Sequence, residues 1–190
     1  DSKWQAEQLL LEAHRKGVIK VSIVRPVNVY GAGMKGNLMT LLKLIARGVL
    51  PPLPDFSEHF SLIGVSDLCQ GILRAGQQIR QENAAIYLLT DGCEYHIKDV
   101  EKAMRVALGK SMPGWSTPRW VFFSAALLLE IVGRLLPINN APGLRSYRVL
   151  SRNYTVDSAA SWQRLGYNPR STFYSELPHI AHPLITRSDS

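Results

Sequence analysis

The chain has 190 residues, enough for a domain with its own hydrophobic core, and 46% of them are hydrophobic, which excludes a wholly disordered protein. Its 22 lysines and arginines outnumber its 15 acidic residues, so its net charge of +7 suits an anionic ligand, a nucleic acid or a membrane surface. The basic residues are scattered, and no helix-turn-helix, zinc-finger or RNA-binding motif appears, so we expect no nucleic-acid partner.

An amphipathic helix and a buried strand are expected at the start of the chain. Residues 2–16 mix apolar and charged residues, and Gly17 suits a C-terminal cap. Residues 20–29 form a β-branched run typical of a parallel strand, and Pro26 marks its end because proline has no N–H for the ladder. In open α/β sheets ligands bind beyond the carboxyl ends of strands, so we expect a ligand near Asn28.

Helices and strands alternate along the rest of the chain. Apolar residues at helical spacing predict helices at residues 37–47, 68–78, 97–108, 120–136 and 157–165. Short apolar or alternating runs predict strands at residues 60–65, 85–89 and 147–156. This alternation favours an α/β fold with a parallel sheet.

The segment at residues 120–136 is the most apolar of the expected helices. It contains Glu130 and Arg134 and lies between Pro118 and Pro137, so it is too short and too charged to span a membrane. Packing within a C-terminal lobe is the first interpretation. A surface that touches lipid or an apolar substrate is the alternative.

Asp67 and the two cysteines have structural interpretations. Asp67 stands between an expected strand and an expected helix, where it would be an N-cap. Cys69 and Cys93 have no Cys-x-x-Cys spacing and no histidine nearby. We therefore expect both to be small buried hydrophobic residues, in a cytoplasmic protein that could also associate with a membrane surface.

Two stretches near the start carry a family resemblance. Lys3 lies at the start of the first expected helix, and the strand after that helix ends Arg25-Pro26-Val27-Asn28-Val29-Tyr30-Gly31. This resembles the extended short-chain dehydrogenase/reductases of the NAD-dependent epimerase/dehydratase group (UDP-glucose 4-epimerase-like), which carry Tyr-x-x-x-Lys, a helix, and a strand ending Arg-Pro-x-x-Val-Tyr-Gly. By this resemblance the tyrosine would fall two residues before Asp1. The family's Gly-x-Gly-x-x-Gly turn is not found in the sequence, so we expect the C-terminal portion of a longer enzyme.

The resemblance extends to about Pro178 and implies a fold. It includes a late segment, Leu165-Gly-Tyr-Asn-Pro169. The fold expected is α/β: the C-terminal part of a doubly wound NAD(P)-binding Rossmann fold plus a small mixed α/β substrate-binding lobe. The Rossmann part would comprise residues 1–31 and 59–92, the lobe residues 32–58 and 93–182, and a mobile tail residues 183–190.

The resemblance also implies roles for four residues. Lys3 would be catalytic and cofactor-binding, because the family's lysine binds the nicotinamide ribose and lowers the pKa of the tyrosine. The backbone around Pro26 and Val29 would lie against the nicotinamide carboxamide, and Asn28 would bind the substrate's pyrophosphate. The plain alternatives are a solvated charge for Lys3 and a turn cap for Asn28.

The implied function is that of an NAD- or NADP-dependent nucleotide-sugar epimerase or dehydratase, inactive as this chain alone. Its partners would be a small nucleotide-sugar substrate and a second copy in a homodimer. No metal site is expected, because the five histidines show no pair at ligand spacing.

Two departures from the family pattern leave alternatives open. Phe60 takes the place of an arginine that binds phosphate in nucleotide-sugar epimerases, and no aspartate completes an Arg-x-x-Asp pattern at Arg145, Arg148 or Arg152. The first alternative is therefore a hydroxysteroid-dehydrogenase-like enzyme or reductase acting on an apolar alcohol. The second is a non-catalytic binding or scaffold domain.

Overall fold

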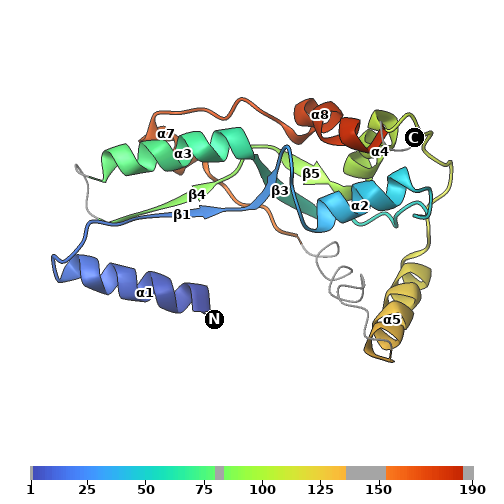
Figure 1. Ribbon diagram of the computed structural model, residues 1–190, viewed down its shortest axis with the longest axis horizontal. Helices are drawn as coiled ribbons and strands as arrows, with labels where there is room; N and C mark the ends of the chain where they lie inside the picture. Colours follow the sequence, from blue (N-terminus) through green and yellow to red (C-terminus); the bar gives the residue numbers. More distant parts are fainter. Residues whose placement is uncertain (1, 80–83, 136–152, 186–190) are drawn as a thin grey trace. The chain divides into compact units, whose positions relative to one another are not determined.

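The computed structural model describes residues 2–79, 84–135 and 153–185, and the chain divides into two compact units (Figure 1). Unit 1 is drawn from Asp1–Tyr30, Ser61–Cys93 and Val156–Phe173. Unit 2 is drawn from Gly31–Phe60, Glu94–Thr155 and Tyr174–Ser190. Residues 156–173 thus belong to unit 1, whereas they were expected in the lobe together with the rest of residues 93–182.

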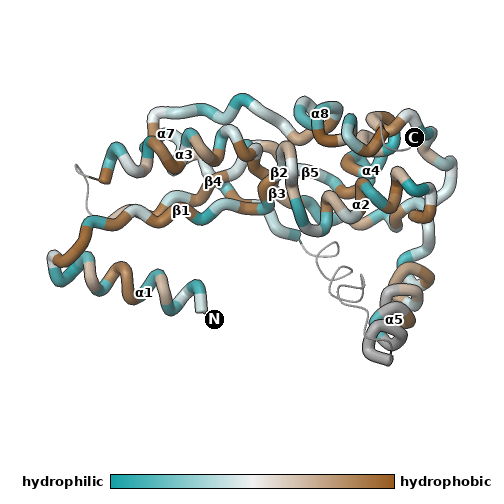
Figure 2. The backbone as a smooth tube through the Cα atoms, in the orientation of Figure 1, coloured by the Kyte–Doolittle hydropathy of each residue, from teal (hydrophilic) through white to brown (hydrophobic). Residues whose placement is uncertain are grey.

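Parallel strand pairs form the centre of unit 1. Strand β1 (Ser22–Pro26) pairs in parallel with β4 (Ala85–Leu89), which contains mainly apolar residues, whereas β1 is apolar at Ile23 and Val24 and polar toward its end (Figure 2). Strand β2 (Asn28–Tyr30) pairs in parallel with β3 (His59–Gly64). The strand expected at residues 20–29 is therefore divided, because the chain changes its partner strand just after Pro26.

Helices complete both units. Together with the parallel strands, they confirm the expected α/β fold class. In unit 1 the helices are α1 (Ser2–Arg15), α3 (Val65–Gln78) and α7 (Ala159–Leu165). Unit 2 contains the short strand β5 (Glu94–His96) and the helices α2 (Asn37–Ala46), α4 (Ile97–Ala107), α5 (Arg119–Leu135) and most of α8 (Phe173–Ile185).

The core of unit 1 lies where α3 and α7 meet β4. Its fully buried members are Ile63, Ala75, Ala85, Tyr87, Leu89, Trp162 and Leu165. Trp162 is fixed by its indole N–H, which donates to the Thr90 carbonyl at 2.7 Å. Helix α3 buries Asp67, Gly71 and Ala75, which lie four residues apart on one face.

A buried ion pair lies in the core of unit 2. Glu101 is fully buried and receives the Arg105 Nε–H at 2.9 Å, one helical turn along α4. The other carboxylate oxygen accepts the Leu53 N–H at 2.9 Å, and Arg105 also donates to the Leu50 carbonyl at 3.2 Å. Both charges are therefore hydrogen-bonded, as burial requires.

The expectation that both cysteines are buried is wrong. Cys69 is exposed, because it lies on the side of α3 away from Gly71 and Ala75, and Cys93 is half-buried. The strand expected at residues 147–156 is not seen as such: residues 147–152 lie outside the described part, and Tyr154 makes only an isolated parallel bridge with Phe60.

No helix was expected at residues 173–185, where α8 forms although it contains Pro178 and Pro183, residues that normally interrupt a helix. Its buried residues nonetheless recur at helical spacing: Phe173, Leu177, Ile180 and Ala181. The helix reaches Ile185, three residues into the range assigned to a mobile tail, and residues 186–190 lie outside the described part.

Substitution by alanine is expected to have opposite effects on stability at the two glycines inside α3. A Cβ at Gly71 would lie 2.6 Å from Leu89 Cδ1 and 3.1 Å from Trp162, whereas a Cβ at Gly76 would meet no atom within 4 Å. We expect Gly71→Ala to lower the free energy of unfolding by about 1–3 kcal/mol through overpacking. Gly76→Ala should raise it by up to about 1 kcal/mol, because alanine is the better helix former. Urea denaturation of both variants tests this, and equal stabilities would contradict the packing seen here.

Candidate functional site

The start of α1 lies at the same end of unit 1 as the carboxyl end of β1 (Figure 1). Arg25, the penultimate residue of β1, shares its Nε–H between the two carboxylate oxygens of Glu7 on α1, at 3.2 and 3.1 Å, and its terminal NH2 group donates to the same carboxylate. Lys3 lies one helical turn before Glu7, so the two side chains share a face of α1. This places Lys3 beside the end of β1.

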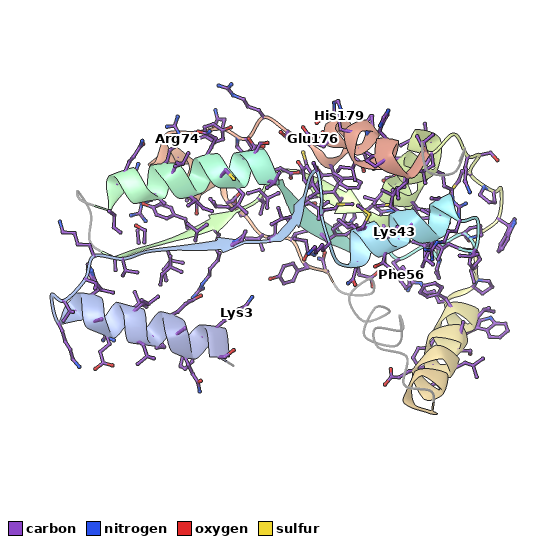
Figure 3. The ribbon with its side chains drawn as sticks, in the orientation of Figure 1. Lys3, Lys43, Phe56, Arg74, Glu176 and His179 are labelled. Atoms are coloured by element: carbon purple, nitrogen blue, oxygen red, sulfur yellow. The ribbon has the colours of Figure 1, made fainter. Side chains whose placement is uncertain are left out.

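Arg25 and Glu7 form an ion pair in which each neutralises the charge of the other. The hydrogen bond from Arg25 is the main reason why the pKa of Glu7 is lowered from 4.5, and the same contact raises the pKa of Arg25. Lys3 differs: it is exposed, and in the described part of the chain its ammonium has no hydrogen-bond or ion-pair partner. Figure 3 shows its side chain projecting from the start of α1 on the side where β1 lies. Lys3 is thus a cation available to a ligand.

The strand end presents polar groups next to this lysine. Pro26 and Asn28 are exposed, and Asn28 is fixed in register opposite Leu62 by the pairing of β2 with β3. Val29 is only partly buried, and its side chain packs against the core of unit 1. Only the backbone of Val29 is therefore suited to the cofactor contact expected from the sequence.

Tyr30 has a structural role within unit 1. It is fully buried, and its hydroxyl lies 2.9 Å from both an oxygen of Asp91 and the Ser171 carbonyl. Asp91 also accepts the N–H of Cys93 at 3.0 Å, which closes the turn after β4. This contact was not expected, and an aspartate directly after a buried strand is the sequence signal that could have indicated it.

Asp67 is not the N-cap that the sequence analysis expected. Helix α3 begins at Val65, three residues earlier than predicted, so Gly64 occupies the N-cap position and Asp67 falls in the first turn. The Asp67 carboxylate is buried and accepts hydrogen bonds from the Tyr167 hydroxyl (2.8 Å) and the N–H groups of Arg170 (3.1 Å) and Ser171 (3.0 Å). It holds the segment at residues 167–171 on α3.

The Tyr167 hydroxyl is kept protonated in this contact. Burial is the main cause that raises its pKa above 10.0, and the hydrogen bond to Asp67 adds to the effect. A protonated phenol can donate to the carboxylate at every physiological pH. Asp67 and Tyr167 therefore have a structural role, which is to hold residues 167–171 on α3.

Other residues singled out in the sequence lie elsewhere. Phe60 is partly buried, with its ring 6.1 Å from that of Tyr95 in unit 2. Arg145, Arg148 and Arg152 lie outside the described residues. Within the described ranges, no three histidine, cysteine or acidic side chains are grouped to hold a metal ion, and no helix has the length and apolar character needed to cross a membrane.

Residues 1–89 match the model of the NAD dependent epimerase/dehydratase family. This part of the chain is therefore similar to that family. The match contains Lys3, Pro26, Asn28 and Val29. The resemblance inferred from the lysine and the strand end is thereby confirmed.

Curated relatives extend the likeness along the chain. UDP-glucose 4-epimerase of Vibrio cholerae is 28% identical over 187 residues, 97% of this chain and 52% of that protein. The N-acetyl-alpha-D-glucosaminyl-diphospho-ditrans,octacis-undecaprenol 4-epimerase of Escherichia coli O157:H7 is 26% identical over 62% of this chain and 36% of its own length. Short-chain dehydrogenase/reductase family 42E member 1 of Mus musculus is 24% identical over 87% of this chain and 46% of its own length. The chain thus spans about half or less of each relative.

Solved structures share the fold. MoeE5, in complex with UDP-glucose and NAD, aligns with a TM-score of 0.65 at 17% identity, over 99% of this chain and 55% of its own. UDP-glucose 4-epimerase of Thermotoga maritima, with UDP-glucose, aligns with a TM-score of 0.66 at 16% identity, over 98% of this chain and 52% of its own. At these identities the likeness concerns the fold alone, and it agrees with the parallel α/β architecture described above.

Proposed function

We propose that this chain is the C-terminal portion of an NAD(P)-dependent nucleotide-sugar epimerase. The observation that carries the proposal is Lys3, which is exposed, without a partner in the described part of the chain, and on the face of α1 that reaches the end of β1. The family match over residues 1–89 and the likeness to a UDP-glucose 4-epimerase along 97% of the chain support it.

The groups at this end of unit 1 fit a dinucleotide and a nucleotide sugar. An exposed ammonium and an exposed amide supply donors for ribose hydroxyls and phosphate oxygens. In the proposal, Lys3 holds the nicotinamide ribose, the backbone around Pro26 and Val29 lies against the carboxamide, and Asn28 holds the substrate's pyrophosphate. The nicotinamide, when bound, supplies hydride acceptance and return.

Lys3 has a second task in this proposal. A nearby cation stabilises phenolate relative to phenol, so Lys3 would lower the pKa of the tyrosine that the family places four residues before it. That tyrosine would exchange a proton with the substrate hydroxyl near neutral pH. The family's Tyr-x-x-x-Lys pair is thus completed only by residues upstream of this sequence.

The test compares the 190-residue chain with a protein that also carries its upstream coding sequence. We expect the longer protein to interconvert UDP-galactose and UDP-glucose, and the 190-residue chain to show no turnover with NAD or NADP. Turnover by the shorter chain would contradict its dependence on an upstream tyrosine. A longer protein that binds NAD but does not act on UDP-sugars would contradict the epimerase assignment.

Asn28→Ala in the longer protein should raise the KM for the nucleotide sugar more than it lowers kcat. A hydrogen bond to a charged phosphate contributes about 1.5–3 kcal/mol, which corresponds to an increase of about 10–100-fold in KM. Asn168→Ala is a matched control, because Asn168 is also exposed and lies in unit 1. Steady-state kinetics measure both variants, and equal KM values would remove Asn28 from the substrate site.

An apolar alcohol is the second candidate substrate. Phe60 in place of a phosphate-binding arginine favours it, and the likeness to short-chain dehydrogenase/reductase family 42E member 1 is compatible with a dehydrogenase or reductase. Thermal shifts of the longer protein with UDP-sugars and with sterol-like alcohols discriminate between the two. If the upstream sequence lacked both the Gly-rich turn and the tyrosine, a non-catalytic domain would be favoured instead. The homodimer and the cytoplasmic location stay predictions.

A further inference from the structure

Two polar contacts attach helix α1 to the strands of unit 1. None of the residues of α1, all of which the structure describes, is buried. Near the end of the helix, His14 Nε2 accepts the N–H of Ala84, which directly precedes β4, at 3.1 Å. Near the start, the Glu7 carboxylate accepts the hydrogen bonds of Arg25 on β1. The first half of α1, which carries Lys3, is therefore oriented by the contact between Glu7 and Arg25.

The contact between Glu7 and Arg25 fixes a direction as well as a distance. Arg25 shares its Nε–H between both carboxylate oxygens, and its terminal NH2 group donates to the same carboxylate. A guanidinium and a carboxylate that meet through more than one hydrogen bond adopt a defined relative orientation. The backbone of Arg25 is itself held opposite Leu88 by the pairing of β1 with β4. The Glu7 carboxylate is thus fixed relative to the end of β1.

Both members of this pair lie next to groups of the candidate site. Lys3 precedes Glu7 by four residues, which corresponds to about 6 Å along the helix axis and about 40° around it. Arg25 directly precedes Pro26. Figure 3 shows Lys3 projecting from the start of α1 on the side where β1 lies. A shift of α1 against β1 would therefore move Lys3 relative to Pro26, and a displacement of about 1 Å can reduce turnover by about 100-fold.

Arg25 also decides which cation the Glu7 carboxylate pairs with. Lys3 and Glu7 have the i, i+4 spacing at which opposite charges attract each other on a helix surface. Glu7 nevertheless pairs with Arg25, and the Lys3 ammonium has no hydrogen-bond or ion-pair partner in the described part of the chain. Without Arg25, Glu7 would be free to pair with Lys3. The neutralised Lys3 would then lower the pKa of the upstream tyrosine less.

We propose that Glu7 and Arg25 are a positioning pair for Lys3. The pair orients the start of α1 on the end of β1, and Arg25 keeps the Glu7 carboxylate away from the Lys3 ammonium. The proposal rests on the proposed function, in which Lys3 binds the cofactor and supports the tyrosine. The side chains of Arg25 and Glu7 are 43% and 20% exposed, and exposed ion pairs contribute little to stability. Loss of the pair should therefore reduce turnover without unfolding the protein.

Steady-state kinetics of the longer protein test the proposal. Arg25→Ala should lower kcat by about 10–100-fold, because the orientation and the free charge of Lys3 are both lost, with little change in KM or melting temperature. The double variant Glu7→Gln/Arg25→Ala should have a kcat about twofold or more above that of Arg25→Ala, since no carboxylate is left to pair with Lys3. Arg25→Lys should recover most of the turnover, because a lysine also pairs with Glu7.

Glu12→Gln is the matched control for these variants. Glu12 is also on α1 and in an ion pair, but its partner Lys16 follows the other end of the same helix, so kcat should be unchanged. Near-normal kcat of Arg25→Ala would overturn the proposal, and so would equal kcat values of Arg25→Ala and the double variant. Thermal melting establishes that the variants fold. If Arg25→Ala does not fold, Arg25→Gln takes its place with the same expected direction.

Hydrogen exchange of the 190-residue chain tests the pair independently of turnover. Arg25→Ala should speed exchange of the amides at residues 6–11 by about two- to fivefold, the factor that corresponds to loss of an exposed ion pair. The control Arg164→Ala removes an exposed arginine that lies over the Tyr87 ring in unit 1, and it should leave this exchange unchanged. Equal exchange in the two variants would overturn the proposal. If Arg25→Ala speeds exchange but the unchanged longer protein does not act on nucleotide sugars, the pair holds α1 and the proposed function is wrong.

Discussion

The Lys3→Ala variant of the longer protein is expected to lose about 10²–10⁴-fold in kcat, the range contributed by general acid–base catalysis. Without the lysine charge, the pKa of the neighbouring tyrosine would return toward ~10, leaving little phenolate at neutral pH. Stability should be unchanged, because Lys3 is exposed, has no partner in the described part of the chain, and alanine is a good helix former. Steady-state kinetics and thermal melting measure the two effects.

Lys16→Ala is the control for this variant. Lys16 follows the other end of α1, is exposed, and pairs with Glu12 at 2.6 Å, a surface ion pair that contributes little. Its removal should leave kcat unchanged. The pH profile gives a further readout, because Lys3→Ala should shift the activity limb set by the tyrosine to higher pH. Near-normal turnover by Lys3→Ala would contradict the catalytic role and show that Lys3 is only a solvated surface charge.

The Asp67→Ala variant is expected to lose about 3 kcal/mol in its free energy of unfolding. The carboxylate is buried and accepts hydrogen bonds from Tyr167, Arg170 and Ser171. Alanine would leave three partly buried donors without their acceptor, which costs about 1–3 kcal/mol for each group that water does not reach. The segment at residues 167–171 would also be released from α3. Urea denaturation and hydrogen exchange in this segment measure the loss.

Asp157→Ala is the matched control, because it removes an exposed aspartate where Asp67→Ala removes a buried one. Asp157 is exposed and accepts the N–H of Ala159 at 2.9 Å before α7, so its removal should cost only about 0.5–2 kcal/mol, as for other caps. Asp67→Ala should be clearly the more destabilising change. If the two variants lose the same stability, the buried contacts of Asp67 do not carry the weight assigned to them here.

Local sequence pattern predicted most elements because it reflects short-range forces. Strand β4 was expected at residues 85–89 and forms there, since an apolar run between turn residues leaves little choice. Helix α4 ends within one residue of its expected end, and the buried face contains Val100 and Met104 as the spacing indicated. Helix α8 was not predicted, although its buried apolar residues recur at helical spacing around Pro178 and Pro183.

For the candidate site, the sequence alone was sufficient to select Lys3 and the strand end at Pro26, Asn28 and Val29. Their spacing follows a family pattern, and the match over residues 1–89 confirms that resemblance. Only the tertiary structure decided that Asp67 is buried and that Cys69 is exposed. Asp67 is held by residues about a hundred positions further along the chain, and Cys69 is exposed because α3 turns its other face to the core. Burial depends on partners that are distant in sequence, and local periodicity holds no information about them.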